Sequence, residues 1–327
     1  MQFSCAFLPS MSIVRYAQLA EELGFTRAWA ADSPAVYGDI WVALARIAEH
    51  TTRIGLGSSV VVPSLRHPLV TASAIATIAE LAPGRLACGF GTGFSARRAL
   101  GKRPMRWADM RTFLLQLRGL LRGEVVEIEG KACQMIHSPG YAPARPISVP
   151  LLVGAGGPKG FAVARELGDG LLCDTITEPG FAWCGLIMCG TVLESGEDHT
   201  TPRVREALGP WWVYGYHRAW EENPAQVAQM PGGVEWLARL EAARPEGQRY
   251  LSVHEGHVVA VNELDRPLLD VAGPALLTAG WTGLPETYAE RIAAAEAQGV
   301  TEIIYVPAGP DIPRELRAFA AATGVSP

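Results

Sequence analysis

The sequence predicts an α/β fold, a TIM-type (β/α)8 barrel with insertions. Segments with a helical apolar face alternate with short apolar runs from residue 2 to about residue 212, and again after about residue 285. These runs are almost continuously apolar, which is typical of parallel strands covered by helices on both faces. Because eight such runs are present, a closed barrel is favoured over an open doubly wound sheet.

The predicted strands follow a junction that recurs five times along the chain. An Ala/Leu/Glu-rich helical pattern ends in Gly or Thr and is followed at once by a short apolar run, as where residues 19–23 and Gly24 precede residues 25–30. The repetition predicts successive helix-to-strand units. The eight strands are predicted near residues 2–8, 25–31, 53–62, 85–91, 150–154, 169–174, 203–213 and 301–307.

The helices between these strands have the expected period and stop signals. Apolar residues occur at i, i+3, i+4, i+7 and i+8 counted from Ile40, which places them on one face of a helix. Gly24, Gly168 and Gly299 follow helical segments, at the positions where left-handed C-terminal caps occur. Both signals support helices that cover the strands.

Two segments interrupt the alternation. Residues 124–137 contain two β-like runs around Glu129-Gly130 and predict a hairpin, whereas residues 214–283 are rich in Pro and Gly turns and predict short helices and loops. We therefore expect a single barrel domain over residues 1–327 with both segments as insertions. In a barrel, such insertions lie beside the mouth that holds the site.

Composition and charge exclude several classes of protein. The 327 residues include 28 Lys+Arg and 33 Asp+Glu, a formal net charge of −5, and 49% are hydrophobic. This balance excludes a disordered chain and disfavours nucleic acid as a partner. The apolar run at residues 181–193 is shorter than a membrane span, and the first residues lack a basic start. Six cysteines without a C-x-x-C pair fit a reduced, cytoplasmic protein.

The ends of predicted strands two and three carry the first candidate binding residues. Asp32 follows an apolar strand, where its carboxylate either accepts hydrogen bonds from a ligand or caps the turn before Pro34. Ser58 and Ser59 precede Val60 in a run of small and then β-branched residues. That order indicates close approach of a flat ligand to the backbone, or tight barrel packing.

Strand four ends in a glycine-rich segment that includes Thr92 and Gly93. It does not match the dinucleotide fingerprint, because the last required glycine is replaced by Phe94. Arg97 begins a basic cluster that extends to Arg106, which is either a solvated helix start or a cradle for an anionic cofactor tail.

Strand five runs into Ala155, Gly156, Gly157, Pro158 and Lys159. Proline suits the first position of a helix, and the free N–H groups of the glycines together with the helix dipole favour an anion. A phosphate site is therefore predicted here, with a ligand-free tight turn as the alternative.

The segment His254-Glu255-Gly256-His257 offers acid/base groups in the larger insertion. A zinc helix requires histidines four residues apart, whereas these are three apart with glycine between them, so we expect no metal. The histidines and Glu255 are instead candidates for a general acid or a substrate contact.

Aromatic residues gather at the end of the predicted seventh strand. Core and rim packing is the favoured interpretation over substrate stacking. The residues are Trp211, Trp212, Tyr214 and Tyr216.

Taken together, these motifs resemble the bacterial luciferase-like family of flavin- and deazaflavin-dependent oxidoreductases. Singly each stretch is weak, whereas the set covers nearly the whole chain outside the larger insertion. The matching stretches are residues 24–32, 51–57, 66–68, 84–93, 157–170 and 299–302.

Within the family, the run Ser59 to Pro63 and the Gly-Gly-Pro turn look most like the branch that uses coenzyme F420, a deazaflavin. The resemblance implies a non-prolyl cis peptide at Ser59–Val60 that backs the deazaflavin ring, and a homodimer. It also implies a set of cofactor-binding residues around the ring and the phosphate. This set comprises Asp32, Ser58, Ser59, Val60, Thr92, Gly93, Arg97, Ala155, Gly156, Gly157, Pro158 and Lys159.

The chain departs from the sugar-phosphate dehydrogenases of that branch at two positions. Ser33 and Phe94 stand where those enzymes have His and Glu, so the acid/base pair is missing and His254, Glu255 and His257 are the remaining candidates. The leading hypothesis is hydride transfer between the deazaflavin and a small, largely apolar organic substrate. The alternatives are an FMN-dependent monooxygenase that uses O₂ and a non-catalytic flavin- or deazaflavin-binding protein.

Overall fold

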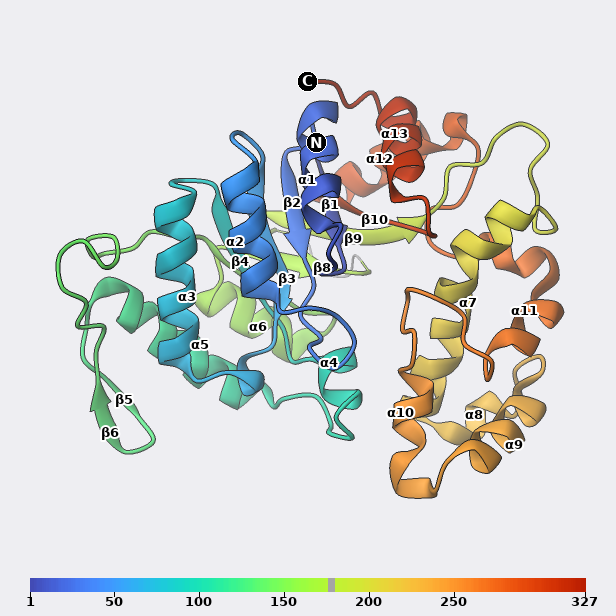
Figure 1. Ribbon diagram of the computed structural model, residues 1–327, viewed down its shortest axis with the longest axis horizontal. Helices are drawn as coiled ribbons and strands as arrows, with labels where there is room; N and C mark the ends of the chain where they lie inside the picture. The colour runs from blue at the N-terminus through green and yellow to red at the C-terminus, as the bar shows by residue number, and fades with distance from the viewer. Residues whose placement is uncertain (176–179) are drawn as a thin grey trace.

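The computed structural model describes residues 1–175 and 180–327, and its centre is a closed barrel of parallel strands (Figure 1). The strands pair in the order β1-β10-β9-β8-β7-β4-β3-β2, so the last strand closes on the first. The predicted (β/α)8 barrel is confirmed. The strands are β1 (Gln2–Phe7), β2 (Arg27–Ala30), β3 (Gly55–Val61), β4 (Leu86–Phe90), β7 (Leu151–Gly154), β8 (Gly170–Cys173), β9 (Cys184–Gly190) and β10 (Glu302–Pro307).

Helices cover the outside of the barrel and bury apolar faces against it. Asp39 begins α2 by accepting hydrogen bonds from the backbone N–H groups of Trp41 and Val42. Gly24 ends α1 at φ 91°, as predicted, whereas Gly168 after α6 has φ −94° and is not a left-handed cap. The helices are α1 (Ile13–Leu23), α2 (Ile40–His50), α3 (Pro68–Leu81), α4 (Phe94–Arg98), α5 (Trp107–Arg122), α6 (Pro158–Leu167), α12 (Tyr288–Ala297) and α13 (Ile312–Thr323), with short 3₁₀ turns at Pro63–Leu65 and Pro285–Thr287.

The barrel interior is filled by a tryptophan and closed by a buried carboxylate. Trp29 occupies space that only a glycine leaves open, since a Cβ at Gly57 would lie 2.2 Å from the indole ring. The carboxylate of Glu302, fully buried at the start of β10, accepts hydrogen bonds from the indole N–H groups of Trp29 (3.0 Å) and Trp183 (2.6 Å). This end of the barrel is therefore packed, which leaves the opposite end for a site.

The smaller interruption is a hairpin at the edge of the molecule. β5 (Val126–Ile128) and β6 (Lys131–Cys133) pair antiparallel across Glu129 and Gly130, which both have positive φ (53° and 72°). Two left-handed central residues are the signature of a type I′ turn.

The prediction of a strand at residues 203–213 is wrong, because this segment lies in α7 (Pro202–Glu222). Pro202 favours the first helical turn, and the buried Val204, Ala207 and Leu208 follow the period of a helix. The seventh barrel strand is β9, within the apolar run at residues 181–193. This run is too short to span a membrane, but it is long enough for a barrel strand.

The larger insertion accordingly begins after β9 and packs as a helical layer beside the barrel (Figure 1). Its centre is a separate apolar cluster around Tyr216, Trp236 and Leu268. Among the helices that the structure describes, none is long and apolar enough to cross a membrane. The elements are α7, α8 (Pro224–Val227), α9 (Gly233–Ala243), a 3₁₀ turn at Glu246–Gln248, α10 (Arg249–Val253), α11 (Arg266–Ala272) and a 3₁₀ segment at Gly273–Thr278.

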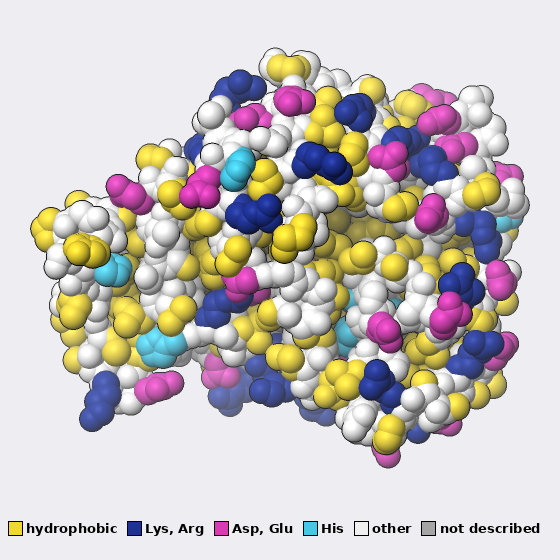
Figure 2. All heavy atoms as spheres, viewed as in Figure 1, with side chains coloured by type: hydrophobic (Ala, Val, Ile, Leu, Met, Phe, Trp, Pro, Cys, Tyr) yellow, Lys and Arg dark blue, Asp and Glu magenta, His cyan; other side chains and the backbone are white. Residues whose placement is uncertain are grey.

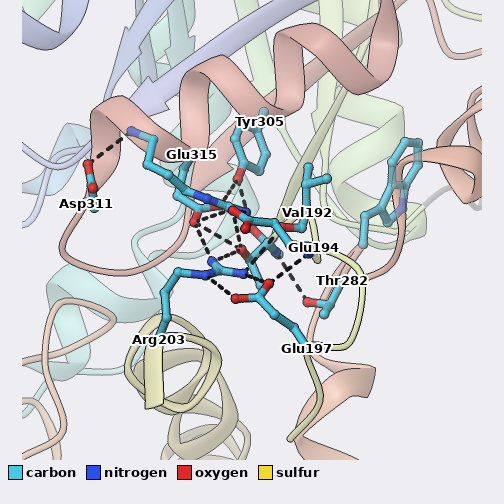
Figure 3. A network of polar contacts seen from close by, with 12 residues as sticks. Val192, Glu194, Glu197, Arg203, Thr282, Tyr305, Asp311 and Glu315 are labelled. Atoms are coloured by element: carbon cyan, nitrogen blue, oxygen red, sulfur yellow. Dashed lines mark hydrogen bonds and ion pairs between the residues drawn. The ribbon is translucent and has the colours of Figure 1, made fainter. Parts of the chain in front are cut away.

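One polar network joins the insertion to the barrel near the start of α7 (Figure 3). Arg203 of α7 forms ion pairs with Glu197 and with Glu315 of α13, the latter at 3.1 Å. The Glu315 carboxylate also accepts hydrogen bonds from Thr191 (3.0 Å) and from the hydroxyl of Tyr305 on β10 (3.1 Å). Because these partners are held by the barrel, the network fixes where α7 leaves it.

Candidate functional site

A cavity of about 940 Å³ lies at the carboxyl ends of the barrel strands, between the barrel and the insertion. Figure 2 shows hydrophobic side chains gathered in the hollow between these two parts. The volume is at the upper end of the range for small-molecule and cofactor sites. Its position at the carboxyl ends of the strands is where barrel enzymes place their active sites.

The barrel wall of this cavity is built around Val60. The Ser59–Val60 peptide is cis, as the resemblance implied, and both residues line the cavity. The Val60 side chain occupies space freed by glycines on two neighbouring strands, because a Cβ at Gly91 or Gly154 would lie 2.3 or 3.0 Å from its methyl groups. The wall is therefore small side chains and exposed backbone, which suits a flat ligand.

Asp32 lines the cavity, but its carboxylate is hydrogen-bonded to other groups of the protein. Its carboxylate accepts two hydrogen bonds from Arg66 (2.6 and 3.1 Å) and one from the backbone N–H of Val62 (3.1 Å). It does not cap the turn before Pro34 through these bonds. Asp32 instead ties the segment after β3 to the end of β2, so it shapes the wall that Val60 forms.

The other predicted residues near β3 and β4 divide into two groups. Thr92 and Gly93 line the cavity. Ser58 is fully buried, with its hydroxyl donating to the carbonyl of Gly89 (3.0 Å), and so holds strand β3 against β4. Arg97 donates to the carbonyl of Arg103 and to Ser64, and is not among the lining residues.

The glycine-rich turn before α6 presents open backbone. Ala155 and Gly156 line the cavity, whereas Gly157, Pro158 and Lys159 continue away from it. A Cβ at Gly157 would meet no atom within 4 Å, and no described side chain caps this helix. The N–H groups of this turn are thus accessible to an anion, with Lys159 exposed beside them.

The insertion wall consists of aromatic side chains. Trp211 and Tyr214 on one face of α7 line the cavity together with Trp281. Trp212 and Tyr216 on the next face pack against each other in the insertion core (ring centroids 6.2 Å apart). The expected packing role therefore holds for Trp212 and Tyr216, whereas Trp211 and Tyr214 line the cavity.

Of the three predicted acid/base residues, only His257 lines the cavity. Its Nε2 is hydrogen-bonded to the hydroxyl of Ser95 (2.9 Å). His254 is buried behind it, paired with Glu221 (3.0 Å), which also accepts from Arg98 (2.8 Å). Glu255 is exposed and is not brought to the cavity.

His257 is held in a neutral form by its surroundings. Burial, together with the neighbouring His254 and His217, lowers the pKa of His257 to about 3. The ring centroids of His257 and His254 are 5.2 Å apart, and those of His257 and His217 are 6.4 Å apart. A neutral imidazole carries one N–H, so it donates from one nitrogen and accepts at the other.

The sequence did not mark two polar cavity residues that contact His257. Ser95 follows Phe94 in α4, and Tyr37 lies in the loop after β2; both line the cavity. The Tyr37 hydroxyl donates to the backbone carbonyl of His257 (2.8 Å), and burial raises the pKa of this hydroxyl. No periodicity or motif marks either residue, because each acquires its partner from a segment more than 150 positions away.

Metal-ligand chemistry has no candidate cluster in the described chain. Across residues 1–175 and 180–327, no three His, Cys, Asp or Glu side chains are grouped so as to hold a metal ion.

Comparisons with known proteins agree with this architecture. Residues 9–302 match the family model described as luciferase-like monooxygenase. The chain is 34% identical over 182 residues to a 5,10-methylenetetrahydromethanopterin reductase from Methanolobus tindarius, covering 53% of each protein. It is 35% identical over 179 residues to an F420-dependent glucose-6-phosphate dehydrogenase from Beutenbergia cavernae (49% of this chain, 52% of that protein). The chain thus spans about half the length of these curated relatives.

Solved structures share the whole fold. An F420-dependent secondary alcohol dehydrogenase, in complex with an F420-acetone adduct, superposes with a TM-score of 0.68 at 15% identity over 100% of both chains. The coenzyme F420-dependent tetrahydromethanopterin reductase from Methanopyrus kandleri gives 0.65 at 20% identity, over 98% of this chain and 97% of that one. On the extent of the family match, the chain belongs to the luciferase-like monooxygenase family.

Proposed function

We propose that this protein is an oxidoreductase that transfers hydride between coenzyme F420 and a small, uncharged organic substrate. One observation carries the proposal: the cavity has two unlike walls that face each other. Around Val60 the barrel wall is small residues and backbone, bordered by aliphatic side chains such as Leu172 and Met188, whereas the insertion wall carries the aromatic rings of Trp211, Tyr214 and Trp281. Such a pair of walls suits a flat coenzyme on one side and an apolar substrate on the other.

The residues present fit a deazaflavin. The glycines let Val60 pack close to the barrel, so that small residues and backbone line the cavity there and offer a surface for a flat ring, which Thr92 and Gly93 continue. The open turn at Gly156 and Gly157 fits the coenzyme's phosphate. When bound, the deazaflavin accepts or delivers hydride at C5 of its ring.

The chain's own residues would hold the coenzyme and the substrate in place and exclude water from them. Asp32 and Arg66 hold the barrel wall in place through their ion pair. Trp211 and Trp281 exclude water from the opposite side, which favours transfer within the cavity. His257, neutral at physiological pH, is the acid/base candidate that reaches the cavity.

The relatives support the choice of coenzyme. The Beutenbergia dehydrogenase and the secondary alcohol dehydrogenase are described as F420-dependent. For this chain, dependence on F420 remains the proposal to be tested.

The test is a titration of the purified apo-protein with F420 and, separately, with FMN, each followed by coenzyme fluorescence. We expect F420 to bind at least tenfold more tightly than FMN. Gly157→Leu is expected to weaken F420 binding about tenfold by covering the open turn, while the extended φ of −164° tolerates a side chain. The matched control is Gly215→Ala, since a Cβ at Gly215 also meets nothing within 4 Å.

Preference for FMN would contradict the proposal and favour O₂-dependent monooxygenation. Tight F420 binding without turnover across a broad substrate panel would favour a non-catalytic binding protein. Equal F420 affinity in Gly157→Leu and the wild type would remove the turn before α6 from the coenzyme site.

A further inference from the structure

The polar group that meets the substrate is found where the two walls of the cavity join. We propose that the Ser95 hydroxyl, positioned by His257, binds the oxygen of an uncharged alcohol or carbonyl substrate. The inference deepens the proposed oxidoreductase function and rests on it. It concerns the hydrogen-bonded pair of Ser95 and His257, which joins α4 of the barrel to the insertion. The Oγ of Ser95 lies 2.9 Å from the Nε2 of His257.

The charges around the cavity exclude an anionic substrate. Among the described residues that line it there is no Lys or Arg. Two carboxylates line the cavity: Asp32 is paired with Arg66, and Asp174 lies 3.8 Å from the guanidinium of Arg218. His257 is neutral because its pKa is lowered to about 3. A phosphate or carboxylate brought to the insertion wall, away from the open turn at Gly156, would lose its hydration without gaining a cation, which is strongly unfavourable. The substrate is therefore uncharged where it contacts the insertion wall.

The surroundings of the pair are apolar. Phe94 precedes Ser95 in the chain, and Trp211, Tyr214 and Trp281 supply the facing wall. The edge of the Tyr214 ring packs against His257, with ring centroids 5.3 Å apart. The substrate body that fills this space is accordingly apolar, and a polar group on it needs a defined partner.

Two other cavity hydroxyls near the insertion are bonded to backbone carbonyls, whereas the hydroxyl of Tyr214 on the same wall has no hydrogen-bond partner among the described residues. The Tyr37 hydroxyl donates to the carbonyl of His257, and the Thr278 hydroxyl donates to the carbonyl of Ala275 (2.8 Å). Ser95 differs because its partner is an imidazole whose Nδ1 is buried and has no hydrogen-bond partner in the described chain. Neither tautomer of His257 is therefore imposed by a fixed group at Nδ1.

This freedom lets one pair recognise both members of an alcohol/carbonyl couple. With the imidazole proton on Nε2, His257 donates to Ser95, and the serine hydroxyl is free to donate to a carbonyl oxygen. With the proton on Nδ1, Nε2 accepts from the serine hydroxyl, whose lone pairs then accept from an alcohol. His257 is thus a positioning residue, and Ser95 is the substrate contact.

The test measures binding of four six-membered-ring probes by ligand-observed NMR titration: cyclohexanol, cyclohexanone, methylcyclohexane and cyclohexanecarboxylate. We expect the wild type to prefer the alcohol and the ketone over the hydrocarbon about fivefold, the effect of one neutral hydrogen bond. The carboxylate is expected to bind more weakly than all three.

Variants assign the preference to the pair. Ser95→Ala is expected to abolish it, and Ser95→Thr to retain it. His257→Ala is expected to reduce it, and His257→Gln to restore it, because the glutamine amide reaches the position of Nε2. The backbone contact from Tyr37 is unaffected by these changes. Thr278→Val is the control, since it removes a cavity hydroxyl that is bonded to Ala275.

The inference would be overturned if Ser95→Ala still preferred the alcohol and the ketone over the hydrocarbon. Tight binding of the carboxylate, or no binding of any probe, would also overturn it. The F420 titration is run on the same proteins and is expected to be unchanged in Ser95→Ala. Failure of the wild type to bind F420 would defeat the proposed function alone. Normal F420 binding without an oxygen preference would defeat the role of Ser95 alone.

Discussion

On the barrel side the cavity wall around Val60 is backbone and small residues bordered by aliphatic side chains such as Leu172 and Met188, whereas on the insertion side aromatic and histidine side chains dominate. The barrel wall is held by strand pairing, by the packing of Val60 against glycines and by the Asp32–Arg66 ion pair. The insertion wall is held by α7 and by side-chain contacts such as Ser95 to His257.

The difference indicates that the two walls are suited to different ligands. Backbone geometry repeats wherever the barrel forms, so it can serve a coenzyme that relatives share. Side chains on an inserted helix vary without disturbing the strands, so they can set the substrate. Single substitutions in each wall, and at the contact between them, would show how strongly each depends on one residue.

The largest effect is expected on the barrel wall. Asp32→Ala leaves the Arg66 guanidinium, whose side chain is 11% exposed, without its main partner and the Val62 N–H unpaired. We expect a loss of about 3 kcal/mol in the free energy of unfolding, measured by urea denaturation. The control, Glu263→Ala, removes an exposed partner of Arg266 and is expected to leave the midpoint unchanged. A wild-type midpoint for Asp32→Ala would show that the ion pair does not hold this wall.

An intermediate effect is expected from pH on the insertion wall. The folded pKa of His257 is about 3, below the ordinary value of 6.5, so between these values only the unfolded chain takes up the proton. The contribution of the neutral His257 to the free energy of unfolding is fully present above pH 6.5 and is lost as the pH falls toward 3. At pH 5 the loss amounts to about 2 kcal/mol.

Urea denaturation at pH 7.5 and pH 5 checks this value. His257→Gln is expected to lose about 2 kcal/mol less than the wild type between the two pH values. His50→Gln changes an exposed imidazole on α2 and is expected to follow the wild type. Identical pH dependence for His257→Gln and the wild type would contradict the assignment of a neutral, buried imidazole.

The smallest effect is expected where the walls touch. Tyr37→Phe removes the hydrogen bond to the carbonyl of His257 and is expected to cost about 1 kcal/mol of unfolding free energy. Tyr141→Phe is the control, because Tyr141 is 83% exposed. Equal stability of Tyr37→Phe and the wild type would mean that water replaces the lost bond.

The barrel itself was predictable because its signals are local. Seven of the eight predicted strands overlap the strands of the barrel, since each is a short apolar run after a helix stop. The hairpin turn at Glu129-Gly130 was marked in the same way by its residue types. The predicted seventh strand, at residues 203–213, was misplaced: Pro202 and the spacing of Val204 and Leu208 favour the helix that the structure has there.

The barrel and the glycine-rich strand ends follow from the sequence alone, and the family resemblance adds the position of the cis peptide. The three-dimensional structure was needed to show that Asp32 bonds Arg66, that Glu255 is exposed and that His257 contacts Ser95. The physical reason is the separation along the chain between the residues that interact. Helix periods, caps and turns depend on neighbours a few positions apart, whereas Ser95 and His257 are separated by 162 positions and come together only when the insertion packs over the barrel mouth.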